Sequence, residues 1–272
     1  MAEGDTLHRT AAGLRPHLVG RMVTAAQGRP GGPQVQRVVG STVTSVEAVG
    51  KNLLIRFDNH LALRTHLRMD GSWHRYRPGE RWRRSAARAR VVLEVPGAVA
   101  VCFDAPVVEL FDSRAEAIHP ALATLGPDLL ASTFGPDAAA EARRRLRTPG
   151  RAEMTISAAL LDQRALAGIG NIWRNETLFE ERVDPWARVR DLDDETLDRV
   201  IATAHRLLRA SADRLPGRSP RRIYGRVGRP CRRCGTPIAS IEAAEGISRI
   251  TYWCPACQAG SGGIDGSRRR SM

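Results

Sequence analysis

Four cysteines near the carboxyl end constrain this chain more than any other feature. They form two pairs, Cys231-x-x-Cys234 and Cys254-x-x-Cys257, with nineteen residues between the pairs. A two-residue gap lets both thiolates of a pair bind one metal ion, and this spacing is typical of a four-cysteine zinc site. The alternative is two disulfides, but nothing else in the sequence indicates an oxidising compartment. Because four thiolates leave zinc no open coordination position, we expect a structural metal.

The charge of the chain indicates a polyanionic partner. The 272 residues carry a net charge of +13, which favours nucleic acid, with non-specific adhesion as the alternative. No apolar run approaches the roughly 18 residues of a membrane helix, and the first residues do not resemble a signal peptide. We therefore expect a cytoplasmic, reduced monomer. The fifth cysteine, Cys102, lies in an apolar run and is predicted to be a buried strand residue.

Lysine is almost absent from the chain. Of 42 basic residues, Lys51 is the single lysine, and the others are arginine. Arginine keeps its proton in proteins, whereas lysine can release it. Either Lys51 is required for proton transfer, or its presence is chance.

The first half of the chain predicts one helix followed by a β-sandwich. Residues 5–18 can be capped by Asp5 or Thr6, with apolar side chains on one face. Short β segments separated by turn residues then favour a sandwich, with a hairpin at Pro96-Gly97. The basic stretch 75–90 is either a DNA-facing edge or a solvated loop. The predicted strands are residues 41–49, 52–58, 60–65, 89–95 and 99–103.

The second half predicts helices and then the cysteine ribbon, so the fold class is α+β. Helical patterns cover residues 137–146, 154–162, 171–181 and 193–215. Gly168-Ile169-Gly170 makes a turn that can direct backbone N–H groups toward phosphate. The Gly/Ser/Arg-rich tail is predicted to be disordered. We assign residues 1–118 to the helix and sandwich, 119–136 to a linker, 137–223 to a helical DNA-binding domain, 224–258 to the zinc finger and 259–272 to the tail.

Several motifs together resemble the formamidopyrimidine-DNA glycosylase/endonuclease VIII family. They are Glu3-Gly4-Asp5-Thr6, Gly50-Lys51-Asn52, the run from Asp162 to Ile172 that contains Gly168-Ile169-Gly170-Asn171, and the ribbon with Tyr224-Gly225-Arg226 and Arg249-Ile250-Thr251. The resemblance covers about residues 1–258. It implies an N-terminal helix with a β-sandwich, a helix–two-turns–helix domain and a zinc finger. It also implies damaged DNA as partner, with the base flipped out for chemistry at the glycosidic carbon, and a bacterial, nucleoid-associated protein.

The resemblance assigns roles to four residues. Glu3 is implied to be the general acid/base that assists sugar opening; the alternative is a helix-start carboxylate. Lys51 is implied to bind phosphate near the lesion and to donate a proton during β-elimination. Asn171 is implied to contact backbone phosphate, or else to cap its helix. Arg249 is implied to reach a lesion-flanking phosphate, or else to be a solvated hairpin arginine.

Further residues are implied to contact DNA. Met69 corresponds to an apolar wedge that fills the gap left by the flipped base, unless it is an ordinary core methionine. Thr124 and Ser157 stand where relatives often carry basic residues that contact phosphate. Other residues must therefore supply part of the contact with the DNA backbone. We predict that it comes from Arg164, Arg174 and Arg226.

The chain departs from the family at its nucleophile. The family uses an N-terminal proline exposed by removal of Met1, and this chain has Ala2. Either Met1 is removed and the primary α-amine of Ala2 forms the Schiff base, or base release is impaired and the protein is a damage binder or a lyase only. The α-amine has a reference pKa of about 7.7–8.0, so a useful fraction is nucleophilic at neutral pH.

Two features favour the endonuclease VIII branch, which acts on oxidised pyrimidines. The segment 215–229 leaves little room for the loop that folds over flipped purines, and the stretch 104–111 lacks the arginine of the purine-directed branch. We expect a bifunctional glycosylase/AP lyase. The alternatives are a non-catalytic damage-binding protein on the same scaffold, and a zinc protein of the ribosome or transcription apparatus.

Overall fold

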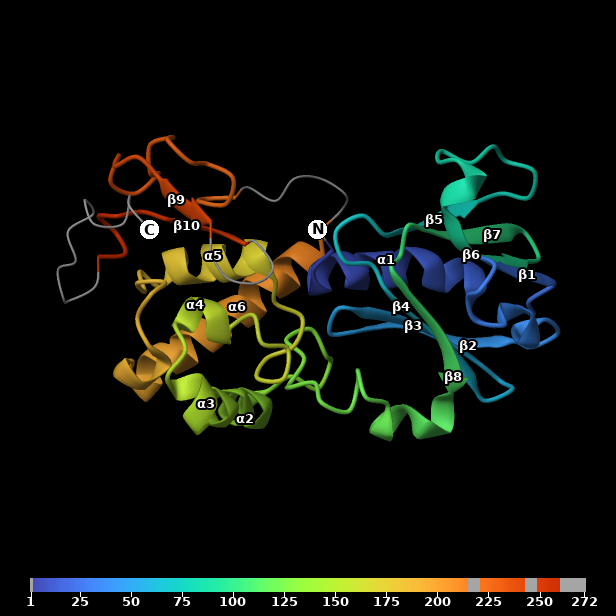
Figure 1. Ribbon diagram of the computed structural model, residues 1–272, viewed down its shortest axis with the longest axis horizontal. Coiled ribbons are helices and arrows are strands. Elements are labelled where there is room, and N and C mark those ends of the chain that lie inside the picture. Colours follow the sequence, from blue (N-terminus) through green and yellow to red (C-terminus); the bar gives the residue numbers. More distant parts are fainter. Residues whose placement is uncertain (1, 215–220, 243–248, 260–272) are drawn as a thin grey trace. The chain divides into compact units, whose positions relative to one another are not determined.

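The structure forms two compact units. The computed structural model describes residues 2–214, 221–242 and 249–259, and the units are residues 1–124 and 125–272. The first contains a helix and a β-sandwich, and the second contains helices and a small hairpin (Figure 1). The tail predicted to be disordered lies, from residue 260 onward, outside the described residues. Within the described ranges, no helix is long and apolar enough to cross a bilayer.

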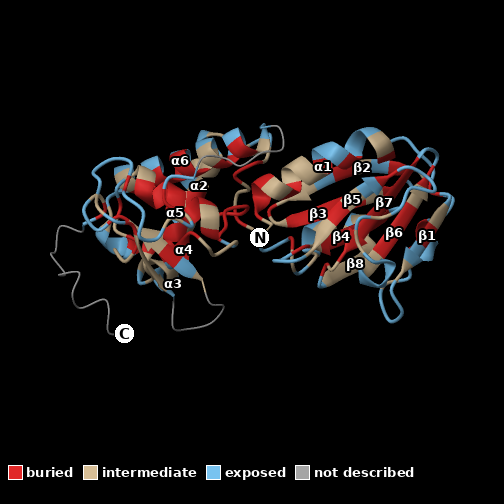
Figure 2. Ribbon diagram, turned by 90° about the horizontal axis from the view of Figure 1, so that it is seen from above, coloured by how far each residue is buried: buried red, intermediate tan, exposed pale blue. Residues whose placement is uncertain are grey.

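Helix α1 (Gly4–Leu18) confirms the first predicted helix. Its apolar face, Leu7, Ala11, Leu14 and Leu18, is buried against the sandwich, and this stripe is visible in Figure 2. Each of the three leucines contributes about 1.5–3 kcal/mol when fully buried. The predicted cap was wrong: the N-cap is Glu3, because its carbonyl accepts the first helical hydrogen bonds.

The sandwich consists of two antiparallel four-stranded sheets. One has the order β1-β6-β7-β5 and the other β2-β3-β4-β8. Their inner faces and the buried stripe of α1 form one apolar core, as alternating strands require. The strands of the first sheet are β1 (Ala25–Gly28), β5 (Ser72–Tyr76), β6 (Ala89–Val95) and β7 (Ala98–Phe103). The strands of the second sheet are β2 (Val43–Val49), β3 (Asn52–Phe57), β4 (Leu61–His66) and β8 (Val107–Asp112).

Five strands and the Pro96-Gly97 hairpin confirm the predictions, and three strands were missed. β1 and β5 lie at the edges of the first sheet, and β8 lies at an edge of the second. Edge strands carry a weak sequence signal, since only one side pairs and one face meets solvent. Short 3₁₀ segments complete the unit: η1 (Val35–Val38), η2 (Ala86–Arg88) and η3 (Ser113–Ile118).

The second unit packs its helices around a separate apolar core. The helix predicted for residues 154–162 was wrong in length: only α4 forms, because Thr155 caps it and a turn follows. α2 ends before Pro149, and Pro149 begins the next short helix at a position where its missing N–H costs no hydrogen bond. The helices are α2 (Pro136–Leu146), α3 (Pro149–Ala152), α4 (Ile156–Ala159), α5 (Asn171–Glu180) and α6 (Asp194–Ala212), with η4 (Val189–Asp191).

The ribbon is a two-stranded antiparallel sheet of β9 (Ala239–Glu242) and β10 (Ile250–Trp253). It shares a small core with α5, which consists of Phe179, Ile223, Ile238 and two of the cysteines. The ribbon and α5 therefore form one packed module inside the second unit.

Candidate functional site

Two turns at one end of the sandwich carry the predicted residues of the first unit. The turn between β2 and β3 holds Lys51, and the turn between β4 and β5 holds Met69. Asn52 pairs with His66, so both turns lie at the same end of the second sheet. The backbone N of Ala2 donates to the carbonyl oxygen of Arg68 at 3.1 Å. The start of the chain is thus held at this end as well.

The turn from Leu67 to Gly71 is tight and presents Met69 outward. A Cβ at Gly71 would lie 2.6 Å from the carbonyl oxygen of Leu67, so only glycine fits. Arg68 adopts a positive φ of 47°, which bends the chain further. Met69 is 59% exposed and is not the core methionine of the alternative interpretation.

Glu3 is buried directly before α1. Its residue surface is 1% exposed, and its backbone carbonyl accepts from the N–H groups of Thr6 and Leu7. Glu3 directly follows Ala2, so a buried acidic residue adjoins the predicted nucleophile in the chain.

The neighbourhood of Lys51 is electropositive. Burial, followed by the charges of Arg64, Lys51 and Arg68, lowers the pKa of His66 to about 4. The imidazole is therefore neutral at neutral pH, and its Nδ1 accepts from the backbone N–H of Arg68. The charge of Lys51 thus acts on His66, which directly precedes the turn whose Arg68 carbonyl accepts from the backbone N of Ala2.

In the second unit, Gln163 organises the loop that leads into α5. Its side-chain amide donates to the carbonyls of Leu161 and Ile169, and its Oε1 accepts from the N–H of Gly168. Gly168 has a φ of 94°, which glycine adopts without strain. These three hydrogen bonds explain why the motif has an amide side chain at position 163.

Side chains at the start of α5 are hydrogen-bonded to the strand that follows Arg249. The Asn171 amide donates to the carbonyl of Ile250 at 3.1 Å, and the buried Arg174 donates to the same carbonyl and to Thr251. Asn175 accepts from the N–H of Tyr252. The structure therefore brings Asn171 and Arg249 together, while Arg174 lies inside the module.

Two further residues that stabilise this module were not predicted from the sequence. The Glu176 carboxylate accepts from three successive backbone N–H groups, those of Arg222, Ile223 and Tyr224. Arg233, between two cysteines, lies over the Phe179 ring at 4.4 Å and pairs with Glu180. The only sequence signal was a helix with polar residues on its buried side, which hydrophobic patterning does not detect.

The four cysteines of the ribbon form a compact cluster. Their sulfurs all lie within 4.8 Å of one another, and Cys234 lies 3.5 Å from Cys254. A disulfide needs about 2.05 Å, whereas sulfurs around one zinc ion, each about 2.3 Å from it, lie roughly 3.8 Å apart. The donor set therefore fits a tetrahedral metal ion and not two disulfides.

The other arginines that were predicted to contact DNA differ in their exposure to solvent. Arg164 is exposed beside the Gln163 loop, and Arg226 is partly buried, donating to the carbonyl of Pro230. Arg249 is half-buried and immediately precedes β10. Arg164, Arg226 and Arg249 all belong to the second unit.

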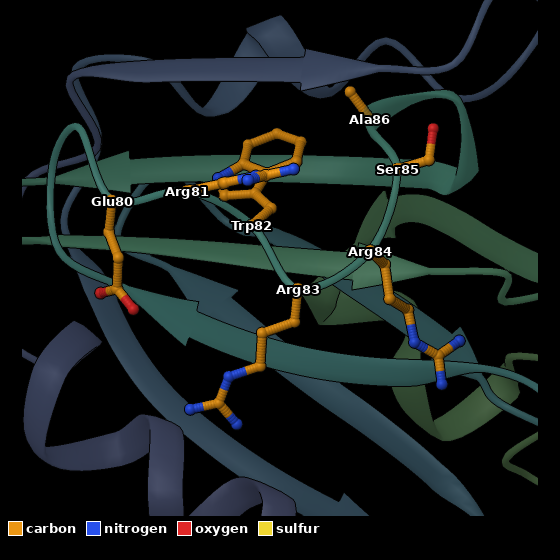
Figure 3. A pocket seen from close by; sticks show the side chains of 7 residues that line it. All are labelled: Glu80, Arg81, Trp82, Arg83, Arg84, Ser85 and Ala86. Atoms are coloured by element: carbon orange, nitrogen blue, oxygen red, sulfur yellow. The ribbon is translucent and has the colours of Figure 1, made fainter.

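The basic stretch 75–90 is a loop anchored by an aromatic side chain. Trp82 contacts the rings of Tyr76 and Phe103 at 6.1 and 5.9 Å between centroids. A hollow of about 660 Å³ lies beside it, and the side chains of Arg83 and Arg84 point away from the Trp82 ring (Figure 3). No predicted site residue lines this hollow. Cys102 is fully buried in β7, as predicted, and burial raises the pKa of its thiol.

Comparison with known proteins identifies the family. The model of the formamidopyrimidine-DNA glycosylase N-terminal domain matches residues 1–111, and that of the formamidopyrimidine-DNA glycosylase H2TH domain matches residues 125–217. The chain belongs to the formamidopyrimidine-DNA glycosylase/endonuclease VIII family. The family that the sequence motifs predicted is therefore confirmed.

Relatives within this family point to the endonuclease VIII side. The chain is 38% identical to "Probable endonuclease 8 2" of Streptomyces coelicolor, over 98% of each chain. It is 36% identical to "DNA-(apurinic or apyrimidinic site) lyase Nei2" of Mycolicibacterium smegmatis, over 96% of this chain and 100% of that protein. The Lactococcus lactis Fpg in complex with N7-benzyl-Fapy-dG DNA shares the fold, with a TM-score of 0.82 and 21% identity, over 95% of this chain and 100% of that one.

Proposed function

We propose that this chain is a bifunctional DNA glycosylase/AP lyase that removes oxidised bases, pyrimidines in preference to purines. The observation that carries this proposal is the backbone N of Ala2, which is held by the Arg68 carbonyl and is followed in the chain by the buried residue Glu3. Lys51 lies at the same end of the sandwich. The names of the curated relatives, endonuclease 8 and AP-site lyase, support the same activity.

The nucleophile is the α-amine of Ala2 after removal of Met1. A primary amine has two hydrogens when unprotonated, so it can keep its hydrogen bond to Arg68 while its lone pair remains available. The lone pair forms a bond to C1′ of the flipped nucleotide as the ring bond between C1′ and O4′ breaks. With a reference pKa of about 7.7–8.0, the amine is partly unprotonated at pH 7.

Glu3 and Lys51 supply the other protons of this scheme. Glu3 protonates the sugar ring oxygen and so opens the ring. The base then leaves C1′ with the electrons of the glycosidic bond and a proton from the amine nitrogen, and a protonated imine between Ala2 and C1′ remains. The Glu3 carboxylate, having given up its proton, takes the proton from C2′, and the C3′–O3′ bond breaks as the 3′ phosphate leaves, with Lys51 bound near the phosphate and donating a proton. Arg249 and Asn171 bind the flanking phosphate, and Met69 fills the gap in the stack.

The four cysteines are proposed to hold one structural Zn²⁺. Burial and then the neighbouring cysteines raise the pKa of Cys257 to about 12, whereas hydrogen bonds with Thr236 and then Cys257 lower the pKa of Cys234 to about 6. A dication supplies the counter-charge that four thiolates require. The ion would fix the ribbon, and with it the strand that follows Arg249.

Cys234→Ser is expected to lower the zinc content from one ion per chain to none that survives dialysis, because a structural site needs all four ligands. Binding to duplex DNA with an abasic site should weaken about 10-fold or more, since Arg249 then lacks its rigid support. Elemental analysis and a binding titration provide the readouts. Cys102→Ala is the matched control and should keep its zinc. Full zinc retention in the Cys234 variant would refute the assignment.

A nicking assay tests the function itself. Purified protein with Met1 removed is incubated with duplexes that contain 5-hydroxyuracil, thymine glycol, 8-oxoguanine or an abasic site. We expect cleavage at the abasic site and at both oxidised pyrimidines, with 8-oxoguanine cleaved at least about 10-fold more slowly, the factor that 1.4 kcal/mol of differential binding gives. Preference for 8-oxoguanine would overturn the proposed specificity.

Ala2 favours a second candidate function, a damage-binding protein without catalysis. A secondary amine forms the iminium ion of the family reaction, and this chain has lost that group. Tight binding to the abasic duplex with no strand cleavage would support this alternative and contradict the first proposal.

A further inference from the structure

Lys51 occupies the tip of a two-residue turn. Val49 and Asn52 pair across the β2–β3 hairpin, so only Gly50 and Lys51 lie between the strands. Gly50 has a φ of 57°, while Lys51 has no positive φ. This pattern is typical of a type II′ turn, whose first central position requires glycine. The direction of the Lys51 side chain therefore depends on how firmly this turn is held.

The buried side chain of Asn52 closes the turn by a hydrogen bond to its first residue, Val49. It is 3% exposed, its Nδ2 donates to the carbonyl of Val49 at 3.1 Å, and its Oδ1 accepts from Arg64 Nε at 2.9 Å. The first hydrogen bond closes the turn on both sides of Lys51. The second ties the same amide to the neighbouring strand β4.

Arg64 connects the amide to a third strand. It is 6% exposed, and it pairs with Glu109 of β8 at 2.6 Å, directly across the sheet. His119 lies 3.3 Å from the same carboxylate oxygen. Three adjacent strands are thus linked by side-chain hydrogen bonds that end at the Lys51 turn.

A buried polar network of this kind is not required for stability in general. A buried guanidinium must be desolvated, and well-packed apolar residues of similar volume are often at least as stable. The positions beside Arg64 on the same sheet face, Leu54 and Ala62, are indeed apolar and fully buried. A buried polar network that is not needed for stability is best explained by the geometry that it imposes.

We propose that Asn52 and Arg64 are positioning residues that fix the Gly50-Lys51 turn and so direct the Lys51 ammonium group. The inference rests on the proposed role of Lys51 in elimination. The residues themselves touch neither the sugar nor the nucleophile in this scheme; they act through the turn.

The scarcity of lysine makes the test direct. Reductive methylation with ¹³C-formaldehyde labels the single lysine and the N-terminal amine, so a spectrum contains one lysine signal that reports on Lys51. In Asn52→Ala and Arg64→Ala, this signal should move to the position of a mobile, solvated lysine. Unlabelled enzyme should lose about 10-fold in β-elimination, the value of one lost hydrogen bond to a charged group, while the yield of borohydride-trapped Schiff base falls less than about twofold.

Arg56→Ala provides the matched control. Arg56 lies on the same sheet face and pairs with Glu116 and Glu47, but it is four residues along β3 from Asn52. It should leave the Lys51 signal and the elimination rate unchanged. The double variant Asn52→Ala/Arg64→Ala should be no worse than either single variant, because the two act through one connection.

The milder Glu109→Gln keeps the shape of the network if the alanine variants fail to fold, and it should shift the Lys51 signal in the same direction. An unchanged Lys51 signal in folded variants would overturn the positioning role. So would an elimination loss in Arg56→Ala equal to that in Arg64→Ala. If no variant and no parent protein cleaves DNA, the proposed function fails, but the lysine signal still decides whether the network fixes the turn.

Discussion

Replacing Glu3 by glutamine is expected to slow base release by roughly 10²–10⁴-fold, the range for a lost general acid. The amide has nearly the shape of the carboxyl group, so α1 and its buried stripe should persist. It cannot deliver a proton to the sugar ring oxygen, and ring opening therefore becomes slow. Single-turnover release of 5-hydroxyuracil from a duplex measures this step separately from strand cleavage.

Asp5→Asn is the matched control for Glu3→Gln. Asp5 is also a buried carboxylate at the start of α1, but it pairs with Arg9 at 3.1 Å in an i, i+4 arrangement. Its neutralisation should lower the melting temperature and leave base release within a few-fold of the parent. If Glu3→Gln released the base as fast as Asp5→Asn, Glu3 would be only a helix-start carboxylate.

Retention of Met1 is expected to abolish strand cleavage. In Ala2→Leu, the larger side chain should block removal of Met1, which intact mass can verify. The Ala2 nitrogen position then holds an amide whose lone pair is delocalised into the carbonyl, and the free amine moves one residue away, about 3.8 Å between Cα atoms. Cleavage of an abasic duplex should fall to the uncatalysed level.

Ala2→Pro and Ala2→Gly serve as controls, since both small residues permit removal of Met1. The proline variant restores the secondary amine of the family and should cleave at least as fast as the parent. If Ala2→Leu with Met1 in place still cleaved DNA through a covalent adduct, another amine would be the nucleophile, and Lys51 would be the first to examine.

The elements with strong periodic patterns could be predicted from the sequence. The apolar stripe of α1 and the β6–β7 hairpin with its Pro96-Gly97 turn were correct to within a residue or two. β1 could not be predicted, because Ala25–Gly28 has low β propensity and becomes a strand only through its pairing with β6. The helix around α4 was overextended because its apolar residues continue into a loop whose shape Gln163 determines.

Site residues could be predicted from the sequence where the chemistry requires one residue type. They could not be predicted where the register of paired strands decides which side chains meet. The cysteine spacing alone indicated the metal cluster, and the single lysine drew attention to Lys51. The partnership of Asn52 with Arg64 depends on the alignment of β3 with β4, and a one-residue slip would send these side chains to opposite faces. No local pattern encodes that alignment.

Borohydride trapping on an abasic-site duplex tests the central claim most directly. Protein whose mass shows removal of Met1 is reduced in the presence of the duplex, digested and mapped. We predict one covalent adduct per chain, located on the α-amine of Ala2. The absence of an adduct, or an adduct on Lys51 instead, would contradict the proposed mechanism.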